Sequence, residues 1–251
     1  MLSVKEVSKN FILSSGIFGV KSGSVTALER VSLEVGERET FALIGESGSG
    51  KTTLARIIAR LTPATAGEVV FEKIGTDSFR KDVQIIFQNP YASLNPRMRV
   101  GEIIAEPLLI HRLAKGARLR ERVVSLLLLV EMDADAAERL PAQFSGGQRQ
   151  RICIARALAT SPKFLILDEP LSSLDLTIQA RMLDMLMDLK EKLGMTYFFI
   201  THNLCLVKRT AGRVAVMKEG RIVEQGETSR VFSAPEHPYT KSLIAAASGR
   251  T

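Results

Sequence analysis

The chain has 251 residues, 24% of them charged and 45% hydrophobic, with a formal net charge of +7 and a pI of about 9.6. This composition predicts a soluble globular protein that is long enough to bury a large core. The basic residues are spread along the chain apart from a small cluster at 115–122, so a dedicated nucleic-acid surface is not expected. The longest strongly apolar run, residues 126–130, is too short to cross a bilayer, and Lys5 and Glu6 argue against a signal peptide.

The first predicted element is a hairpin at the start of the chain. Residues 2–7 and 31–35 have the pattern of short strands, and the Gly/Ser-rich segment from Ser14 to Ser24 is expected to be the long loop between them. A third strand is predicted at residues 40–44, a short apolar run of the kind found in buried strands.

A phosphate-binding loop follows that strand. The sequence Gly45-Glu46-Ser47-Gly48-Ser49-Gly50-Lys51-Thr52 matches G-x-x-x-x-G-K-[ST]. After it, Leu54, Ile57, Ile58 and Leu61 recur at the spacing of one helix face. Glycines at such a turn let backbone N–H groups wrap phosphate oxygens, and the helix N-terminus adds its positive dipole end. Lys51 is expected to reach the β- and γ-phosphates and the Thr52 hydroxyl to hold Mg²⁺. The alternative, a glycine turn with a surface lysine, leaves the flanking strand and helix unexplained.

The remaining elements alternate between strands and helices. Strands are predicted at 68–71, 83–87, 164–167 and 196–200, a hairpin at 213–224 around Gly220, and a helix whose buried face carries Met182, Met185, Leu186, Leu189 and Leu193. This alternation predicts an α/β fold with a mostly parallel sheet covered on both faces. Residues 89–160 show only helical patterns, so they are predicted to form a helical lobe inserted into that core.

Two carboxylates end the predicted strand at 164–167. In open parallel sheets, ligands bind beyond the carboxyl ends of the strands. Asp168 is therefore expected to hold the Mg²⁺ that Thr52 also holds, and Glu169 to accept a proton from an attacking water. The alternative is a loop that happens to contain two acidic residues.

A second candidate phosphate site lies at Ser145-Gly146-Gly147-Gln148, immediately before a helical run. Its backbone N–H groups form another helix N-terminus suited to phosphate. Since one nucleotide already occupies the first loop, this second terminus is predicted to serve the nucleotide of another chain.

These motifs, in this order, resemble those of ATP-binding subunits of ABC transporters over essentially the whole chain. Gln88 resembles the Q-loop glutamine, Ser145-Gly146-Gly147-Gln148 the signature, Ser172-Ser173-Leu174-Asp175 the D-loop, and His202 the switch histidine. The resemblance implies ATP and Mg²⁺ as cofactors and assigns catalysis to Glu169, His202 and Gln88. It assigns the metal to Thr52, Gln88 and Asp168, and the nucleotide to Phe11, Gly45, Glu46, Ser47, Gly48, Ser49, Gly50, Lys51, Thr52, Thr53, Ser145, Gly146, Gly147, Gln148 and Asp175.

Three of these assignments have simpler alternatives. Phe11 sits where the family places an aromatic ring on adenine, and it would otherwise be a core phenylalanine. His202 would otherwise be a hydrogen-bonded histidine at a strand end, and Gln88 a surface amide. Three residues also depart from the family pattern: Phe144 before the signature, Ser173 in the D-loop, and Asn203 in place of the aspartate common after the switch histidine.

Two further stretches narrow the resemblance. Residues 87–98 and the tail 236–243 are similar to ATPases of oligopeptide, dipeptide and nickel importers. The implied protein is the ATPase subunit of an importer at the cytoplasmic face of the membrane, with peptide, nickel or a metal chelate as cargo. Its partners would be two membrane-spanning permease subunits and a second ATPase chain, expected to differ from this one, in a head-to-tail dimer. An extracellular solute-binding protein would act with them indirectly.

The implied domain organisation is a single ABC ATPase domain. Residues 1–88 and 161–227 would form the nucleotide-binding core with its β subdomain, 89–160 the helical subdomain, and 228–251 a C-terminal extension. Two other functions fit less well: an ABC-type ATPase acting on nucleic acid or ribosomes, and a regulatory subunit that does not hydrolyse ATP.

Overall fold

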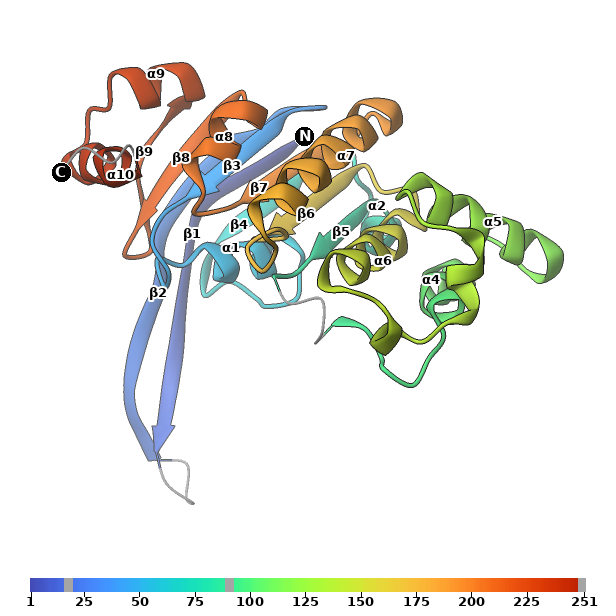
Figure 1. Cartoon of the computed structure of the whole chain (residues 1–251). Coiled ribbons are helices and arrows are strands. Elements are labelled where there is room, and N and C mark those ends of the chain that lie inside the picture. Colours follow the sequence, from blue (N-terminus) through green and yellow to red (C-terminus); the bar gives the residue numbers. More distant parts are fainter. Residues whose placement is uncertain (16–19, 89–92, 248–251) are drawn as a thin grey trace. The chain divides into compact units, whose positions relative to one another are not determined.

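The computed structural model describes residues 1–15, 20–88 and 93–247, which fold into two compact units (Figure 1). One unit comprises Met1–Ile74 and Tyr197–Thr251, and the other Gly75–Thr196. These two units have other boundaries than the nucleotide-binding core, helical subdomain and C-terminal extension expected from the sequence. That division stays a prediction. Within the gaps lie Gly16–Gly19 of the predicted loop, Asn89–Ala92 of the Q-loop stretch, and the last four residues of the extension.

The first unit is built on a buried parallel sheet. Strand β3 (Thr40–Ile44) lies between β7 (Thr196–Ile200) and β8 (Arg213–Lys218), parallel to both, and β9 (Arg221–Glu227) pairs antiparallel with β8. Every residue of β3 and β7 is buried, as expected of parallel strands covered on both faces. The helices of this unit are α1 (Lys51–Ile58), α8 (Leu204–Thr210), α9 (Thr228–Ser233) and α10 (Pro238–Ala247).

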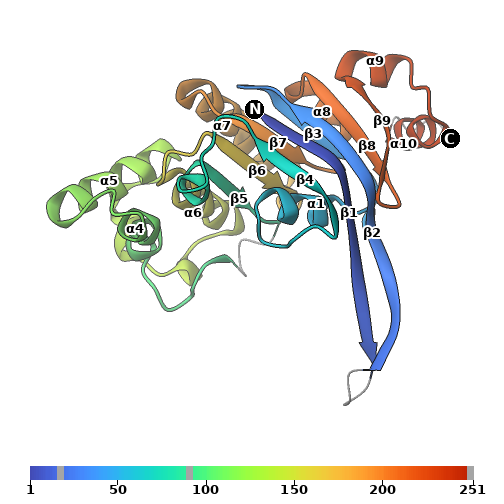
Figure 2. The ribbon, with the colours of Figure 1, turned by 180° about the vertical axis from the view of Figure 1, so that it is seen from behind.

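A separate antiparallel sheet in the same unit has the order β2-β1-β4 (Figure 2). Its strands are β1 (Leu2–Ser15), β2 (Val20–Val35) and β4 (Ala66–Phe71). The predicted long loop from Ser14 to Ser24 is therefore wrong, because pairing continues to Ser15↔Val20. Strand propensity depends on context, and here backbone pairing with the opposite strand extends the ribbon into the Gly/Ser-rich segment.

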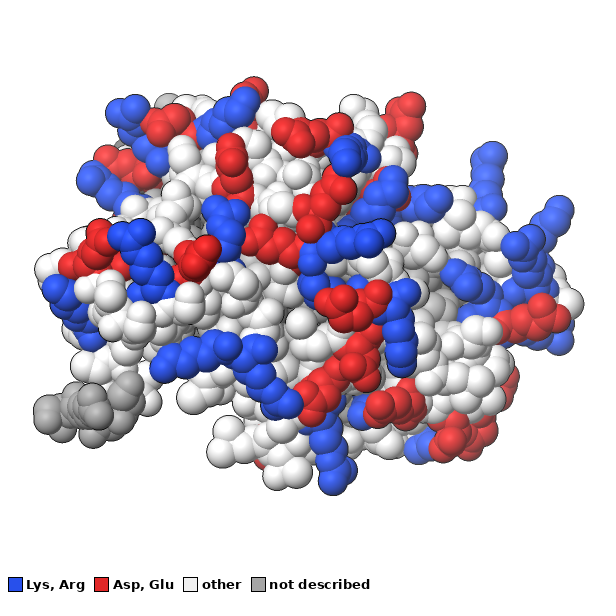
Figure 3. Space-filling view, turned by 90° about the horizontal axis from the view of Figure 1, so that it is seen from above, with Lys and Arg blue, Asp and Glu red and all other residues white. Residues whose placement is uncertain are grey.

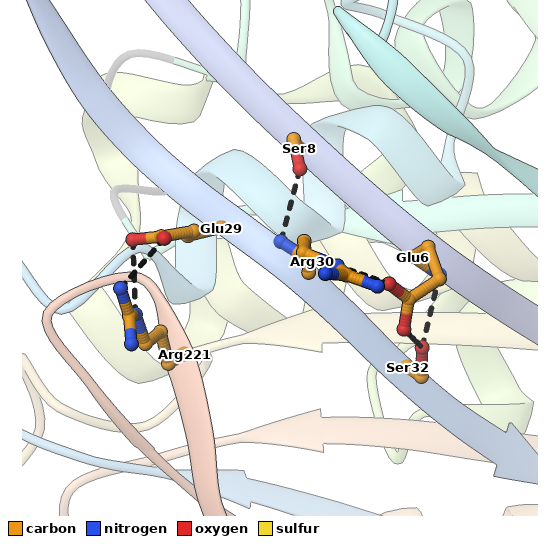
Figure 4. A network of polar contacts seen from close by, with 6 residues as sticks. All are labelled: Glu6, Ser8, Glu29, Arg30, Ser32 and Arg221. Carbon is orange, nitrogen blue, oxygen red and sulfur yellow. Dashed lines mark hydrogen bonds and ion pairs between the residues drawn. The ribbon is translucent and has the colours of Figure 1, made fainter.

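Acidic and basic side chains are interspersed on the face of the molecule drawn in Figure 3. A network of polar contacts links the antiparallel sheet to β9 (Figure 4). Arg221 forms two contacts with the Glu29 carboxylate, at 2.6 and 2.9 Å, and Arg30 pairs with Glu6. Next to this pair the Glu29 N–H donates to the Gly220 carbonyl at 2.8 Å. The turn between β8 and β9 is thus attached to β2. The same turn also contacts the loop between β3 and α1.

The second unit pairs two parallel strands and is otherwise helical. Strands β5 (Val83–Ile86) and β6 (Phe164–Asp168) pair in register from Val83↔Phe164 to Ile86↔Leu167. The described residues 93–160 contain helices and turns and no strand. The helices of this unit are α2 (Phe79–Asp82), α4 (Val100–Ile110), α5 (Gly116–Leu129), η1 (Ala134–Glu138), η2 (Pro141–Gln143), α6 (Gly146–Leu158) and α7 (Leu176–Leu193).

The predicted α/β class, with a mostly parallel sheet and an antiparallel β subdomain, is confirmed. Two residues that were predicted on the buried faces of helices are exposed instead. Leu61 is 58% exposed because α1 ends at Ile58, and Leu193 is 46% exposed at the last position of α7. A stripe of apolar residues stays on one face only while the helix continues, so residues at or beyond its end leave the core.

Candidate nucleotide-binding site

The phosphate loop joins β3 to α1, and two of its glycines are required by the backbone. Gly45 has φ 153°, and a Cβ there would lie 2.2 Å from the Met217 carbonyl oxygen. Gly50 has φ 109°, and a Cβ there would lie 2.6 Å from the Ala27 carbonyl oxygen. Only glycine tolerates these conformations and this close approach of neighbouring backbone. The loop is therefore packed between β8 and β2.

Lys51 lies at the centre of this loop. Its side chain is buried, at 5% exposure, and Nζ donates to the carbonyl oxygens of Gly45 at 2.9 Å and Glu46 at 2.7 Å. The alternative of a surface lysine is thus excluded. These bonds fold the loop around an ammonium group at the N-terminus of α1, and both the ammonium and the helix end attract an anion.

Neighbouring elements hold the loop from outside. The Gly220 N–H donates to the Ser49 carbonyl at 2.9 Å, and the Glu46 N–H donates to the Tyr239 hydroxyl at 3.1 Å. Sequence reasoning assigned no role in the site to Gly220 or Tyr239. The similarity of residues 236–243 to importer ATPases was a signal for Tyr239, but it carried no indication of what the tail contacts.

Phe11 and His202 belong to the same unit as the loop. Phe11 lies on β1 with 42% of its surface exposed, and Lys9 Nζ lies 5.1 Å from its ring centroid. The alternative of a core phenylalanine is therefore excluded. His202 is exposed just after β7, and Asn203 caps α8 by accepting a hydrogen bond from the Cys205 N–H at 3.0 Å. Asparagine caps helices as well as aspartate does, so this departure keeps the cap.

The second unit brings Gln88 and Glu169 together. The Gln88 amide Nε2 donates to Glu169 Oε2 at 3.2 Å. The two residues meet because Ile86 and Leu167 are paired in β5 and β6, and each functional residue lies two positions further on. Asp168 is buried at the end of β6, and Glu169 has a φ of 49°, which is uncommon for a residue with a side chain. Such strain is often found at functional sites.

The signature segment forms the N-terminus of α6. Ser145 Oγ accepts from the Gln148 N–H at 3.3 Å, and Gln148 Oε1 accepts from the Ser145 N–H at 2.9 Å. This reciprocal capping box fixes the helix start. A Cβ on Gly147 would lie 3.1 Å from Ile178 of α7, and Asp175 caps α7 by accepting from the Ile178 N–H at 3.0 Å. The nucleotide-binding roles of Ser145, Gly146, Gly147, Gln148 and Asp175 remain predictions.

The donors proposed for Mg²⁺ are the oxygens of Thr52, Gln88 and Asp168, which suit a hard cation. In the part of the chain that the structure describes, no cluster of three or more His, Cys, Asp or Glu side chains is placed to hold a metal ion. Mg²⁺ bound mainly through phosphate oxygens and one carboxylate does not need such a cluster.

A glycine loop that surrounds a buried lysine at the start of a helix, in an α/β fold with a strand ending in two carboxylates, defines a P-loop nucleotide-hydrolysing protein. Comparison with known proteins agrees with this class. Residues 28–172 match the family model described as ABC transporter. The chain belongs to the ABC transporter family and is an ATPase of that family.

Individual relatives support the same assignment. The chain is 45% identical to the glutathione import ATP-binding protein GsiA of Salmonella paratyphi A over 98% of its own length, and it spans 41% of the length of that relative. Among solved structures it is similar to the ATP-binding cassette MJ0796 in a dimeric post-hydrolysis state bound to ADP and Pi, at 30% identity and a TM-score of 0.78, covering 91% of this chain and 99% of the other. It is also similar to cbiO1 of the Clostridium perfringens ABC transporter complex cbiONQ, at 26% identity and a TM-score of 0.77, covering 93% and 90%.

Among the described residues, no helix combines the length and the apolar character that crossing a bilayer requires.

Proposed function

We propose that this chain is the ATP-hydrolysing subunit of an importer for small peptides or chemically related cargo, acting through separate membrane subunits. The observation that carries the proposal is the pair of preformed groups described above. Lys51 is buried in a closed glycine loop, and the Gln88 amide is hydrogen-bonded to Glu169. The first group suits the phosphates of ATP, and the second suits a water that attacks the terminal phosphate.

The residues divide the reaction between them. Lys51 binds and orients the β- and γ-phosphates, and Phe11 stacks on the adenine. Glu169 accepts the proton of the attacking water, while Gln88 holds the Glu169 carboxylate in place. His202 contacts the terminal phosphate. Thr52, Gln88 and Asp168 would hold Mg²⁺, which would supply positive charge to offset that of the phosphates.

A second ATPase chain completes the site. Ser145–Gln148 would contact the nucleotide held by the partner's loop in a head-to-tail dimer. Support comes from the firmly capped start of α6, which presents these residues on a rigid helix end, and from the dimeric relative MJ0796. The partner is expected to be a different chain, and ATP then drives the switch by binding the closed dimer more tightly than the open one.

A groove in the second unit suits the membrane subunits. It has a volume of about 930 Å³ and lies between α4, α5 and η1. Its walls include Leu109 and Ile110, which are 51% and 68% exposed, and charged residues of both signs: Glu102, Glu106, Arg120, and Glu138, which pairs with Arg99. An amphipathic helix with an apolar face and polar flanks would fit such a groove. One permease subunit would supply such a helix to this chain and the other permease subunit to the partner ATPase. The chain would then act at the cytoplasmic face of the membrane.

Similarity supports a small peptide as the cargo. The GsiA relatives are named for glutathione import, and glutathione is a small peptide. Nickel and metal chelates remain alternatives, because residues 87–98 and 236–243 are similar to ATPases that serve those cargoes too.

The test is reconstitution of the full chain with its membrane subunits in vesicles, with a partner ATPase and a solute-binding protein supplied. We expect ATP hydrolysis to be stimulated by the membrane subunits and loaded binding protein, with uptake of labelled glutathione, a dipeptide or Ni²⁺. Stimulation by DNA or RNA instead would favour the nucleic-acid role, and no hydrolysis in any mixture would favour a regulatory subunit. Full transport with this chain as the only ATPase would refute the heterodimer.

A further inference from the structure

The C-terminal extension packs on the core of the first unit. Tyr239 of α10 joins a buried apolar cluster with Ala42 and Ile44 of β3, the strand that leads into the phosphate loop. Leu243 and Ile244 of the same helix pack against this cluster from outside. The described part of the extension, up to residue 247, thus packs next to the strand that leads into the phosphate loop.

A carboxylate on β9 fixes the start of this helix. Glu224 accepts hydrogen bonds from the backbone N–H groups of Glu236 at 2.9 Å and His237 at 3.0 Å. The Lys218 ammonium lies 5.2 Å from the centroid of the Tyr239 ring, within the range of a cation–π contact. The position of the Tyr239 ring is therefore determined by its packing, by β8 and by β9.

The Tyr239 hydroxyl reaches the phosphate loop itself. It accepts the hydrogen bond from the Glu46 N–H at 3.1 Å, across 193 positions of sequence. The Glu46 carbonyl accepts from Lys51, so Glu46 is held at both of its backbone groups. Burial raises the pKa of Tyr239 above its usual range, so the hydroxyl stays protonated near pH 7.

From this geometry we propose that Tyr239 is a positioning residue for the phosphate loop and that the C-terminal extension sets nucleotide affinity through it. Its hydrogen bond favours the bent loop over other loop conformations before nucleotide arrives. A loop that is already bent binds nucleotide at no ordering cost. Because coupling between sites is reciprocal, bound nucleotide must also stabilise the docked extension. The affinity argument depends on the proposed function, in which this loop binds ATP.

The test uses the full chain and the variant Tyr239→Phe, which removes the hydroxyl and keeps the packed ring. One net hydrogen bond corresponds to roughly a two- to ten-fold change in an equilibrium constant. We expect the Kd for ATP and ADP and the KM for ATP to rise by that factor with kcat unchanged, and hydrogen exchange at Glu46 to become faster in the nucleotide-free protein. Nucleotide should slow exchange in α10 of the wild type more than in the variant.

The matched control is Ser242→Ala, which removes another hydroxyl from α10, one that donates to the Tyr239 carbonyl at 2.8 Å. It should leave affinity and loop exchange as in the wild type. Unchanged Kd, KM and Glu46 exchange in Tyr239→Phe would overturn the proposal, as would an equal effect of Ser242→Ala. If the wild type bound no ATP, the proposed function would fail, and exchange at Glu46 in the nucleotide-free proteins would still decide the role of Tyr239.

Discussion

Replacing Glu169 with glutamine tests the assignment of the general base. Glu169 Oε2 lies 3.2 Å from the Gln88 amide nitrogen, and a glutamine side chain retains an oxygen that can accept this bond. The backbone at Glu169, with φ 49°, is equally accessible to glutamine. The substitution therefore removes one property, the capacity of the side chain to take a proton from water.

The expected loss follows from that capacity. General-base catalysis contributes about 10²–10⁴-fold to a rate, which corresponds to roughly 2.7–5.4 kcal/mol of activation free energy. Phosphate release under single-turnover conditions should slow by such a factor in Glu169→Gln, while ATP affinity should stay within about two-fold of the wild type, since the hydrogen bond that holds residue 169 persists. The slow variant should also accumulate in an ATP-bound dimer when its partner is present.

A matched control is Glu121→Gln, which makes the same chemical change on an exposed face of α5 and should leave turnover unaltered. Turnover of Glu169→Gln close to that of the wild type would refute the assignment. His202 would then be the next candidate for the base.

Three other substitutions or reactions probe separate parts of the structure. Lys51→Ala should weaken ATP binding by more than about a hundred-fold, because charge-assisted hydrogen bonds from the lysine to the phosphates, of about 1.5–3 kcal/mol each, are lost. Circular dichroism should show a retained fold, and unchanged affinity in a titration would contradict the site. Gly50→Ala should lower the thermal unfolding midpoint, since its φ of 109° and a β2 carbonyl oxygen 2.6 Å from the new Cβ impose strain of about 1–3 kcal/mol. The control Gly212→Ala, whose new Cβ has nothing within 4 Å, should leave the midpoint unchanged, and equal midpoints of the two variants would be contrary evidence. Burial raises the pKa of Cys153 to about 11, so iodoacetamide at pH 8 should alkylate the exposed Cys205 and spare Cys153 in the folded protein, and mass spectrometry showing modified Cys153 would be inconsistent with the structure.

The sequence by itself determined the parts of this protein that depend on neighbouring residues. The glycine turn between a strand and a helix, the strand at 40–44 and the strand at 196–200 were all predicted correctly, because glycine spacing and short apolar runs are local signals. The α/β class followed from the alternation of such runs with helical patterns. The order of the motifs along the chain was enough to indicate the family.

Tertiary structure alone decided how far each element extends and which distant residues meet. The β1–β2 ribbon continues into a Gly/Ser-rich segment, as far as the pair Ser15↔Val20, because cross-strand backbone pairing maintains it. Gln88 and Glu169, 81 positions apart, meet because β5 and β6 are adjacent and in register. The contact between Tyr239 and the phosphate loop depends on where α10 packs. Such contacts arise from long-range packing of side chains and strands, which no local pattern in the sequence encodes.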